Sequence, residues 1–139
     1  MNENKTPQSV FDIEALEQDF RQPDFIEIPL PRGGVLVMRT NVDVSEWRDI
    51  PRNAGAWMQA VKESPFWDEL GCDAMTSRDL INAFIFRHYS IPEMSDAAAI
   101  RFVKALRLGV VDILDQFENG IRLMDAVRMQ ELLEKKKGS

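Results

Sequence analysis

Apolar residues follow different spacings along the chain, and each spacing predicts a different element. In the acidic leader, residues 1–24, Ile13, Leu16 and Phe20 lie three and four positions apart, the spacing of one narrow stripe on a short amphipathic helix. A helix of about twelve residues is marginal in water by itself. The stripe therefore needs a surface to cover it, which belongs either to the same domain or to a partner.

Residues 25–40 have the pattern of a β-hairpin. Two runs of β-prone residues flank Gly33-Gly34, and paired glycines are typical of the turn that joins antiparallel strands. Pro29 and Pro31 have no N–H to donate to a neighbouring strand, so the first strand must be a sheet edge. Because a two-stranded hairpin is not stable alone, we expect it to pack against the helices that follow.

The remainder of the chain has helical spacing, and its longest apolar run predicts one central helix over residues 96–118. The buried face of this helix is expected to consist of Ile100, Val103, Leu106, Val110, Ile113 and Phe117. Asn119-Gly120 is expected to break or kink the helix.

Shorter helical elements are expected on both sides of this helix. A turn ends at Pro51, a helix covers residues 53–63, and a further helix runs from Thr76 to a point before Pro92. A final helix covers residues 121–133. Its expected anchors are Leu123, Val127 and Leu133.

The pattern predicts a mainly α fold with a small β-hairpin (α+β): a compact helical domain around the long helix, with the hairpin packed on it. The chain has 139 residues, 45% hydrophobic and 29% charged, which is ordinary for one globular domain that needs no metal or disulfide to hold its core. We assign residues 25–135 to this domain, residues 1–24 to the leader and residues 136–139 to a frayed tail.

Charge and composition disfavour several functional classes. The 17 Lys and Arg against 23 Asp and Glu give a net charge of −6, a poor basis for general binding to nucleic acid or anionic lipid. No apolar window reaches the length of a membrane span, and the polar start lacks the apolar stretch of a signal peptide. The lone Cys72 fits a reducing compartment. These features predict a cytoplasmic protein.

Few residues carry reactive chemistry. Cys72 is the only thiol and His88 the only imidazole, so the chain cannot supply the four ligands of a structural zinc site from these residue types. His88 is expected near the C-terminal end of its helix, where an imidazolium interacts favourably with the helix dipole. We expect no enzymatic activity and no cofactor. A small enzyme is an alternative, and it would need Cys72, His88 and a carboxylate to converge in one cleft.

A DNA-binding regulator is the other alternative. Two consecutive predicted helices around residues 90–92 suggest a helix-turn-helix. The second of these helices, however, opens with Asp96 and three alanines, which offer no donor to base edges. Nucleic acid is therefore disfavoured as a partner. The densest set of basic residues is Arg78, Arg87, Arg101, Lys104 and Arg107.

The predicted long helix has an unusual order of charges, basic in its first half and acidic in its second. The residues concerned are Arg101, Lys104, Arg107, Asp112, Asp115 and Glu118. This order opposes the helix dipole, which favours acidic residues at the start and basic residues at the end. Two antiparallel copies of the helix would compensate the order, which predicts a homodimer. The acidic leader packed along residues 101–107 is the intramolecular alternative, and exposure to solvent is the third.

The remaining features predict a non-enzymatic protein-binding module: an adaptor, an assembly chaperone or an inhibitor. The available surfaces are an acidic surface that suits a partner with a basic face, an edge strand open to β-augmentation, and the amphipathic leader. For the leader, closure of its own domain's core is the competing interpretation. The residues expected to bind the partner are Phe11, Ile13, Leu16, Phe20, Ile26 and Ile28.

Overall fold

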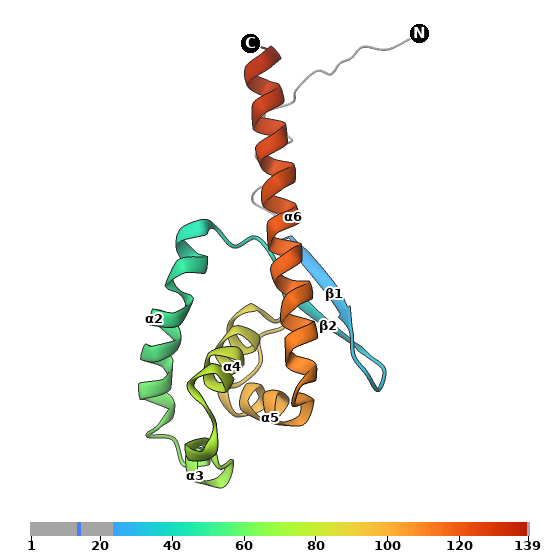
Figure 1. Cartoon of the computed structure of the whole chain (residues 1–139). Helices are drawn as coiled ribbons and strands as arrows, with labels where there is room; N and C mark the ends of the chain where they lie inside the picture. The colour runs from blue at the N-terminus through green and yellow to red at the C-terminus, as the bar shows by residue number, and fades with distance from the viewer. Residues whose placement is uncertain (1–13, 15–23, 139) are drawn as a thin grey trace.

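The computed structural model describes residue 14 and residues 24–138, and it confirms a mainly α fold with a two-stranded hairpin (Figure 1). Helix α2 lies on one side of the fold and α6 on the other, with α4 and α5 between them. The elements are β1 (Phe25–Pro29), β2 (Val35–Arg39), α2 (Val44–Val61), α3 (Phe66–Glu69), the 3-10 helix η2 (Cys72–Ala74), α4 (Ser77–Tyr89), α5 (Asp96–Leu106) and α6 (Gly109–Gly138).

The hairpin forms as predicted. Strands β1 and β2 are antiparallel, with Ile28 opposite Leu36. Gly33 and Gly34 make the turn with φ of 95° and 83°, a backbone region that glycine adopts without the steric cost that other residues meet. Ile28 and Met38 are fully buried and Leu36 is nearly so, which places one face of the hairpin in the core.

Strand β1 contacts α6 at a glycine. A Cβ atom on Gly120 would lie only 3.2 Å from Cγ2 of Thr40 and 3.3 Å from Cδ1 of Ile26. Gly120 therefore permits a close approach between the helix and the hairpin. The predicted break at Asn119-Gly120 is wrong, because α6 continues through both residues.

Strand β2 is held from the other side by α4 and the segment that follows it. The N–H of Ile91 donates to the carbonyl of Val37 at 2.9 Å, next to an isolated bridge between Met38 and Ser90. The hairpin is thus fixed between α6 and the end of α4, as its instability in isolation requires.

The predicted central helix is in fact two helices. Helix α5 ends at Leu106 and α6 begins at Gly109, and between them Arg107 has φ of 54°. Lys104 lies in the last turn of α5 and Asp112 in the first turn of α6, so each charge stands at the helix end that stabilises it. The prediction of one dipole-opposed helix over residues 96–118 is therefore wrong.

The predicted apolar face survives this corner. Because α5 and α6 both pack on the same core, the apolar spacing continues from one helix to the next. The buried members are Ile100, Val103, Val110, Ile113 and Phe117, and Leu106 is partly buried.

Helix α2 also differs from its prediction. It begins at Val44, after an N-cap in which the carboxylate of Asp43 accepts from the Glu46 N–H at 2.7 Å, and it continues through Pro51. The predicted end at Pro51 is wrong because burial of Ile50 and Ala54 against the core outweighs the lost backbone hydrogen bond.

Helix α4 is the most buried of the described helices and begins with a capping box. Thr76 Oγ1 accepts from the Asp79 N–H, and the Asp79 carboxylate accepts from the Thr76 N–H, both at 3.1 Å. Helix α4 contacts both α2 and α5. Its buried residues are Leu80, Ala83, Phe84, Ile85, Phe86 and Tyr89.

Helix α6 has 30 residues, a length of about 45 Å, and its second half extends beyond the other described helices (Figure 1). We call residues 122–138 the projecting half of α6. The predicted anchors of the last helix are wrong, since Leu123, Val127 and Leu133 are all exposed. The helical backbone reaches Gly138, within the tail that was expected to fray.

Candidate functional site

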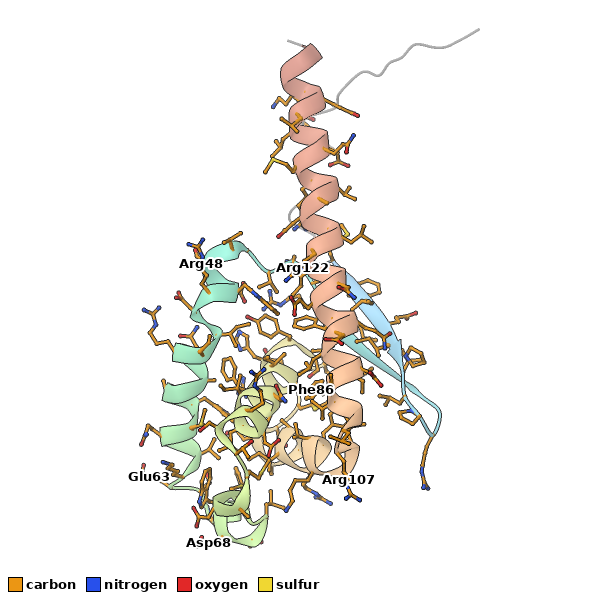
Figure 2. The ribbon with its side chains drawn as sticks, viewed as in Figure 1. Arg48, Glu63, Asp68, Phe86, Arg107 and Arg122 are labelled. Carbon is orange, nitrogen blue, oxygen red and sulfur yellow. The ribbon has the colours of Figure 1, made fainter. Side chains whose placement is uncertain are left out.

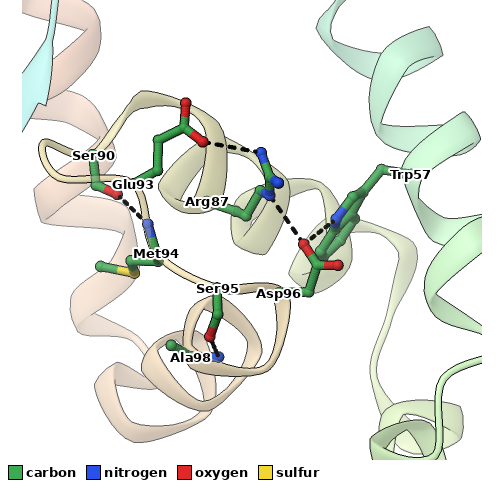
Figure 3. Close-up of polar contacts among 8 residues, drawn as sticks. All are labelled: Trp57, Arg87, Ser90, Glu93, Met94, Ser95, Asp96 and Ala98. Carbon is green, nitrogen blue, oxygen red and sulfur yellow. Dashed lines mark hydrogen bonds and ion pairs between the residues drawn. The ribbon is translucent and has the colours of Figure 1, made fainter.

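A polar cluster joins three helices where α4 leads into α5 (Figure 3). The carboxylate of Asp96 accepts hydrogen bonds from Trp57 Nε1 at 2.9 Å and from Arg87 Nε at 3.0 Å. Arg87 also forms an ion pair with Glu93 at 3.4 Å. Because these charged and polar groups satisfy one another, the cluster fixes α2, α4 and α5 relative to each other.

A second polar cluster lies at the end of α4. The hydroxyl of Tyr89 donates to Glu46 Oε2 at 2.8 Å, and Arg39 Nη2 lies 3.2 Å from the same oxygen. The guanidinium carbon of Arg39 lies 4.9 Å from the centre of the Tyr89 ring. Burial, reinforced by the hydrogen bond to Glu46, raises the pKa of Tyr89 well above the usual range of a phenol. The hydroxyl is therefore a neutral donor that ties α4 to α2.

The structure does not bring the reactive residues together. Cys72 lies in η2, before α4 begins, whereas His88 lies in the last turn of α4, so most of α4 separates them along the chain. Burial raises the pKa of the Cys72 thiol, with Lys104 nearby as an opposing influence. The His88 ring stacks on Phe84, with ring centres 5.4 Å apart. This arrangement gives no support to a Cys–His nucleophile pair, and it confirms the expected position of His88 at a helix end.

Two further kinds of site are not found in the part of the chain that the structure describes. Among residues 14 and 24–138, no three His, Cys, Asp or Glu side chains converge in a way that would hold a metal ion. No helix within the same residues combines the length and the apolar character that crossing a membrane requires.

A shallow groove of about 390 Å³ lies between α2, α4 and α6. Its wall is mostly apolar and includes Trp47, whose ring centre lies 6.2 Å from that of Phe117. Asp115 and Glu118, two of the residues predicted to mediate self-association, line it, with Arg78 among the other lining residues. The groove brings these charges beside an apolar wall but holds no convergent reactive groups.

The free edge of the hairpin belongs to β1. Thr40 donates to the Asp24 carbonyl at 2.8 Å and Leu30 donates to the Gly34 carbonyl at 3.1 Å, which fixes which residues point toward β2. The backbone groups of Phe25, Glu27 and Pro29 therefore point away from it. No other described strand pairs with this edge.

Exposed apolar side chains are concentrated on the projecting half of α6. Leu123 is 64% exposed and Leu133 is 54% exposed, although both are large aliphatic residues. Singly exposed apolar residues are ordinary, whereas here several lie within one extended stretch of helix. The full set consists of Leu123, Val127, Met129, Leu132 and Leu133.

The structure describes only some of the predicted partner-binding residues. Phe11, Ile13, Leu16 and Phe20 lie outside the described residues, so their role stays a prediction. Ile26 is partly buried beneath α6.

Ile28 is fully buried in the core, so its side chain is not on a surface that could contact a partner in this structure. Burial alternates along β1, so Ile28 and Ile26 share one face of the strand, as the alternation of side chains in a strand requires. Which face is buried depends on the helices that cover the hairpin.

The residues predicted for self-association lie on two helices. Arg101 and Lys104 belong to α5, Arg107 to the corner, and Asp112, Asp115 and Glu118 to α6. Antiparallel pairing of one long helix therefore loses its basis. A homodimer itself stays a prediction.

Two of the five basic residues named above have partners within the protein. Arg87 pairs with Asp96 and Glu93, and Lys104 donates to the carbonyl of Leu70, so these cations are engaged within the protein. Arg78 lies at the opposite end of α4 from Arg87.

Sequence reasoning missed the projecting half of α6 as a surface. Its apolar residues have helical spacing, and such spacing predicts a buried face. The only available signal was that they occupy more than one side of the helix, since Met129 and Val127 are two positions apart and point in different directions.

The chain matches no protein-family model, no curated protein and no solved structure.

Proposed function

We propose that this chain is a non-enzymatic protein-binding module of the cytoplasm, an adaptor, assembly chaperone or inhibitor. The observation that carries the proposal is the group of exposed apolar residues on the projecting half of α6. An extended helix with apolar side chains in water is suited to a hydrophobic groove or to another helix. The polar clusters at Asp96 and Tyr89 have structural partners and offer no competing site.

The partner we propose is a protein with a basic face around an apolar contact. The chain carries a net charge of −6, which attracts such a face and repels another acidic one. On α6 itself, Asp112, Asp115 and Glu118 belong to the first half, so the basic face of the partner would lie against the domain while its apolar contact lies along the projecting half. Apolar contacts would supply affinity, and charge would supply orientation and rate of association.

The outer edge of β1 is a second surface for the same function. Phe25 and Glu27 direct their backbone N–H and C=O groups away from β2, and Phe25 is 58% exposed. An extended partner segment could add to this edge as a third strand, although Pro29 offers no N–H there and limits its length.

The test compares capture by wild-type chain with capture by a variant of the projecting half. The double substitution Leu123→Asp and Leu133→Asp places charge on the proposed surface, and Val44→Asp, at an exposed residue of α2, is the matched control. Each protein is used as bait in extracts of the native host, with quantitative mass spectrometry and circular dichroism.

We expect one or more proteins to bind wild type and the control and to be lost with the double variant. Their binding should weaken as salt rises, since charge complementarity is screened. Equal recovery with all three baits would overturn the role of the projecting half. Recovery of nucleic acid in place of protein would favour the DNA-binding alternative.

A further inference from the structure

The projecting half of α6 has two unequal sides. Met124, Arg128, Glu131 and Lys135 lie four, three and four positions apart and are all partly buried. Leu123, like the other exposed apolar residues, lies away from this line. We call the first set the covered face of α6. Partial burial on one face of a helix that extends past the domain indicates that something lies along it.

The chain itself arrives at this face. Asp24, the last residue of the leader, forms an ion pair with Arg128, and the two side chains are only 23% and 21% exposed. Asp24 also accepts from Thr40 through its carbonyl, so its position is fixed by the hairpin as well. The leader therefore joins the hairpin beside the middle of the projecting half and not beside the α5–α6 corner.

The length of α6 beyond Arg128 matches the length of the leader. From Arg128 to Gly138, α6 rises about 15 Å, and residues 9–20 of the leader would span about 17 Å as a helix. Glu14, within that segment, is helical and exposed. Three residues separate Phe20 from Asp24, which is enough chain to bring a helix back along α6 in the antiparallel direction.

Charges match as well. Residues 9–20 contain four carboxylates, Asp12, Glu14, Glu17 and Asp19, and no Lys or Arg. The covered face offers Arg128 and Lys135, with Glu131 as the acidic exception between them, and the sequence continues with Lys136 and Lys137. An antiparallel helix would set its acidic residues beside these cations and its dipole against that of α6.

We infer that the leader docks within the same chain on the covered face of α6, antiparallel to it, with Ile13, Leu16 and Phe20 facing the helix. This placement differs from the predicted contact along residues 101–107. Figure 2 shows Arg107 at the far end of the domain from the projecting half, whereas Arg122 lies at its base. The leader then covers one side of α6 and leaves Leu123, Val127 and Met129 for a partner.

The inference is independent of the proposed function, because the leader can dock whether or not a partner binds beside it. The test uses the full chain with a nitroxide on Glu14→Cys. Cys72 is buried and its thiol pKa is raised, so it reacts slowly with the label. Nuclear magnetic resonance then measures which backbone amides are broadened.

We expect strong broadening of amides in residues 128–138 and none in α3, at the other end of the domain. Absence of broadening in residues 128–138 would overturn the inference. A mixed sample distinguishes broadening within one chain from broadening between two copies. It combines isotope-labelled chain without the nitroxide and unlabelled chain that carries the nitroxide. Broadening in that mixture would show docking between copies and would likewise overturn docking within one chain.

A charge variant tests the electrostatic part. Lys135→Glu should reduce the broadening, whereas Lys62→Glu, at an exposed lysine just after α2, should leave it unchanged. If both variants retain full broadening, charge complementarity is not what holds the leader. If both lose it equally, the effect is a general one of net charge and the specific pairing is refuted.

Discussion

The two halves of α6 contain similar residues in opposite surroundings. In the first half Val110, Ile113 and Phe117 are buried, whereas in the projecting half Leu123 and Leu133 are exposed. Both halves repeat apolar residues at helical intervals. The comparison teaches that apolar spacing determines where the chain is helical, while burial depends on which other elements reach that part of the helix.

The projecting half can be helical without being packed. Starting a helix is costly, but extending one adds a hydrogen bond for each residue that is fixed. The first half of α6 is already held by the core and by β1 at Gly120. The residues that follow are mostly good helix formers, such as Leu, Met, Glu and Lys, so the helix continues past the domain.

The largest expected effect on stability comes from shortening one apolar side chain in each half to alanine. Phe117→Ala should lower the free energy of unfolding by about 3–5 kcal/mol, because it leaves a cavity beneath Trp47 and Tyr89. Leu133→Ala should change it by less than about 0.5 kcal/mol, since that side chain is exposed. Urea denaturation followed by circular dichroism measures both. Similar losses in the two variants would mean that the projecting half is packed as tightly as the first.

The next effect tests the junction between the halves. Gly120→Leu should destabilise the protein by about 1–3 kcal/mol, because its side chain would meet Thr40 and Ile26. Gly55→Leu is the matched control within α2, where a Cβ meets nothing within 4 Å, and the gain in helix propensity should stabilise the protein by up to about 1 kcal/mol. Thermal unfolding compares the two. A stabilising Gly120→Leu would show that the hairpin is not held against α6.

The smallest effect reports on the packing under the first half. Tyr89, the single tyrosine, lies with its ring centre 5.5 Å from that of Phe117, and its pKa is raised by burial. In the unfolded chain the Tyr89 phenol ionises near pH 10, whereas in the folded chain it stays neutral there. The contribution of buried, neutral Tyr89 to the free energy of unfolding is therefore complete below about pH 10 and declines as pH rises above it. Tyr89→Phe should remove that decline.

Ultraviolet absorbance of tyrosinate measures this directly. In folded protein the signal should appear at higher pH than in urea, where it should appear near pH 10. A normal titration in the folded protein would mean that water reaches Tyr89 and that the region beneath the first half of α6 is open.

Much of the fold was predictable because it depends on local chemistry. The Gly33-Gly34 turn, the exclusion of Pro29 from inner pairing and the capping box at Thr76 each involve residues a few positions apart. The errors occurred where local rules gave two answers. A glycine at position 120 is compatible with a break or with a close contact, and only the position of the hairpin distinguishes them.

The candidate surfaces were less predictable. The edge of β1 followed from proline chemistry, but the placement of Ile28 in the core did not, since the sequence does not say which helix covers a strand. The charge order of residues 101–118 is compatible with two arrangements. It is unfavourable for one helix and favourable for two, and the corner at Arg107 decides between these.

By itself, the sequence determined the helical and hairpin segments, the sign of the overall charge and the scarcity of reactive side chains, because propensity, spacing and composition belong to the chain alone. Only the tertiary structure decided where α5 ends, which apolar residues stay in water and where the leader joins the hairpin. Those outcomes depend on contacts between distant segments such as Asp24 and Arg128, whose energies no local pattern contains.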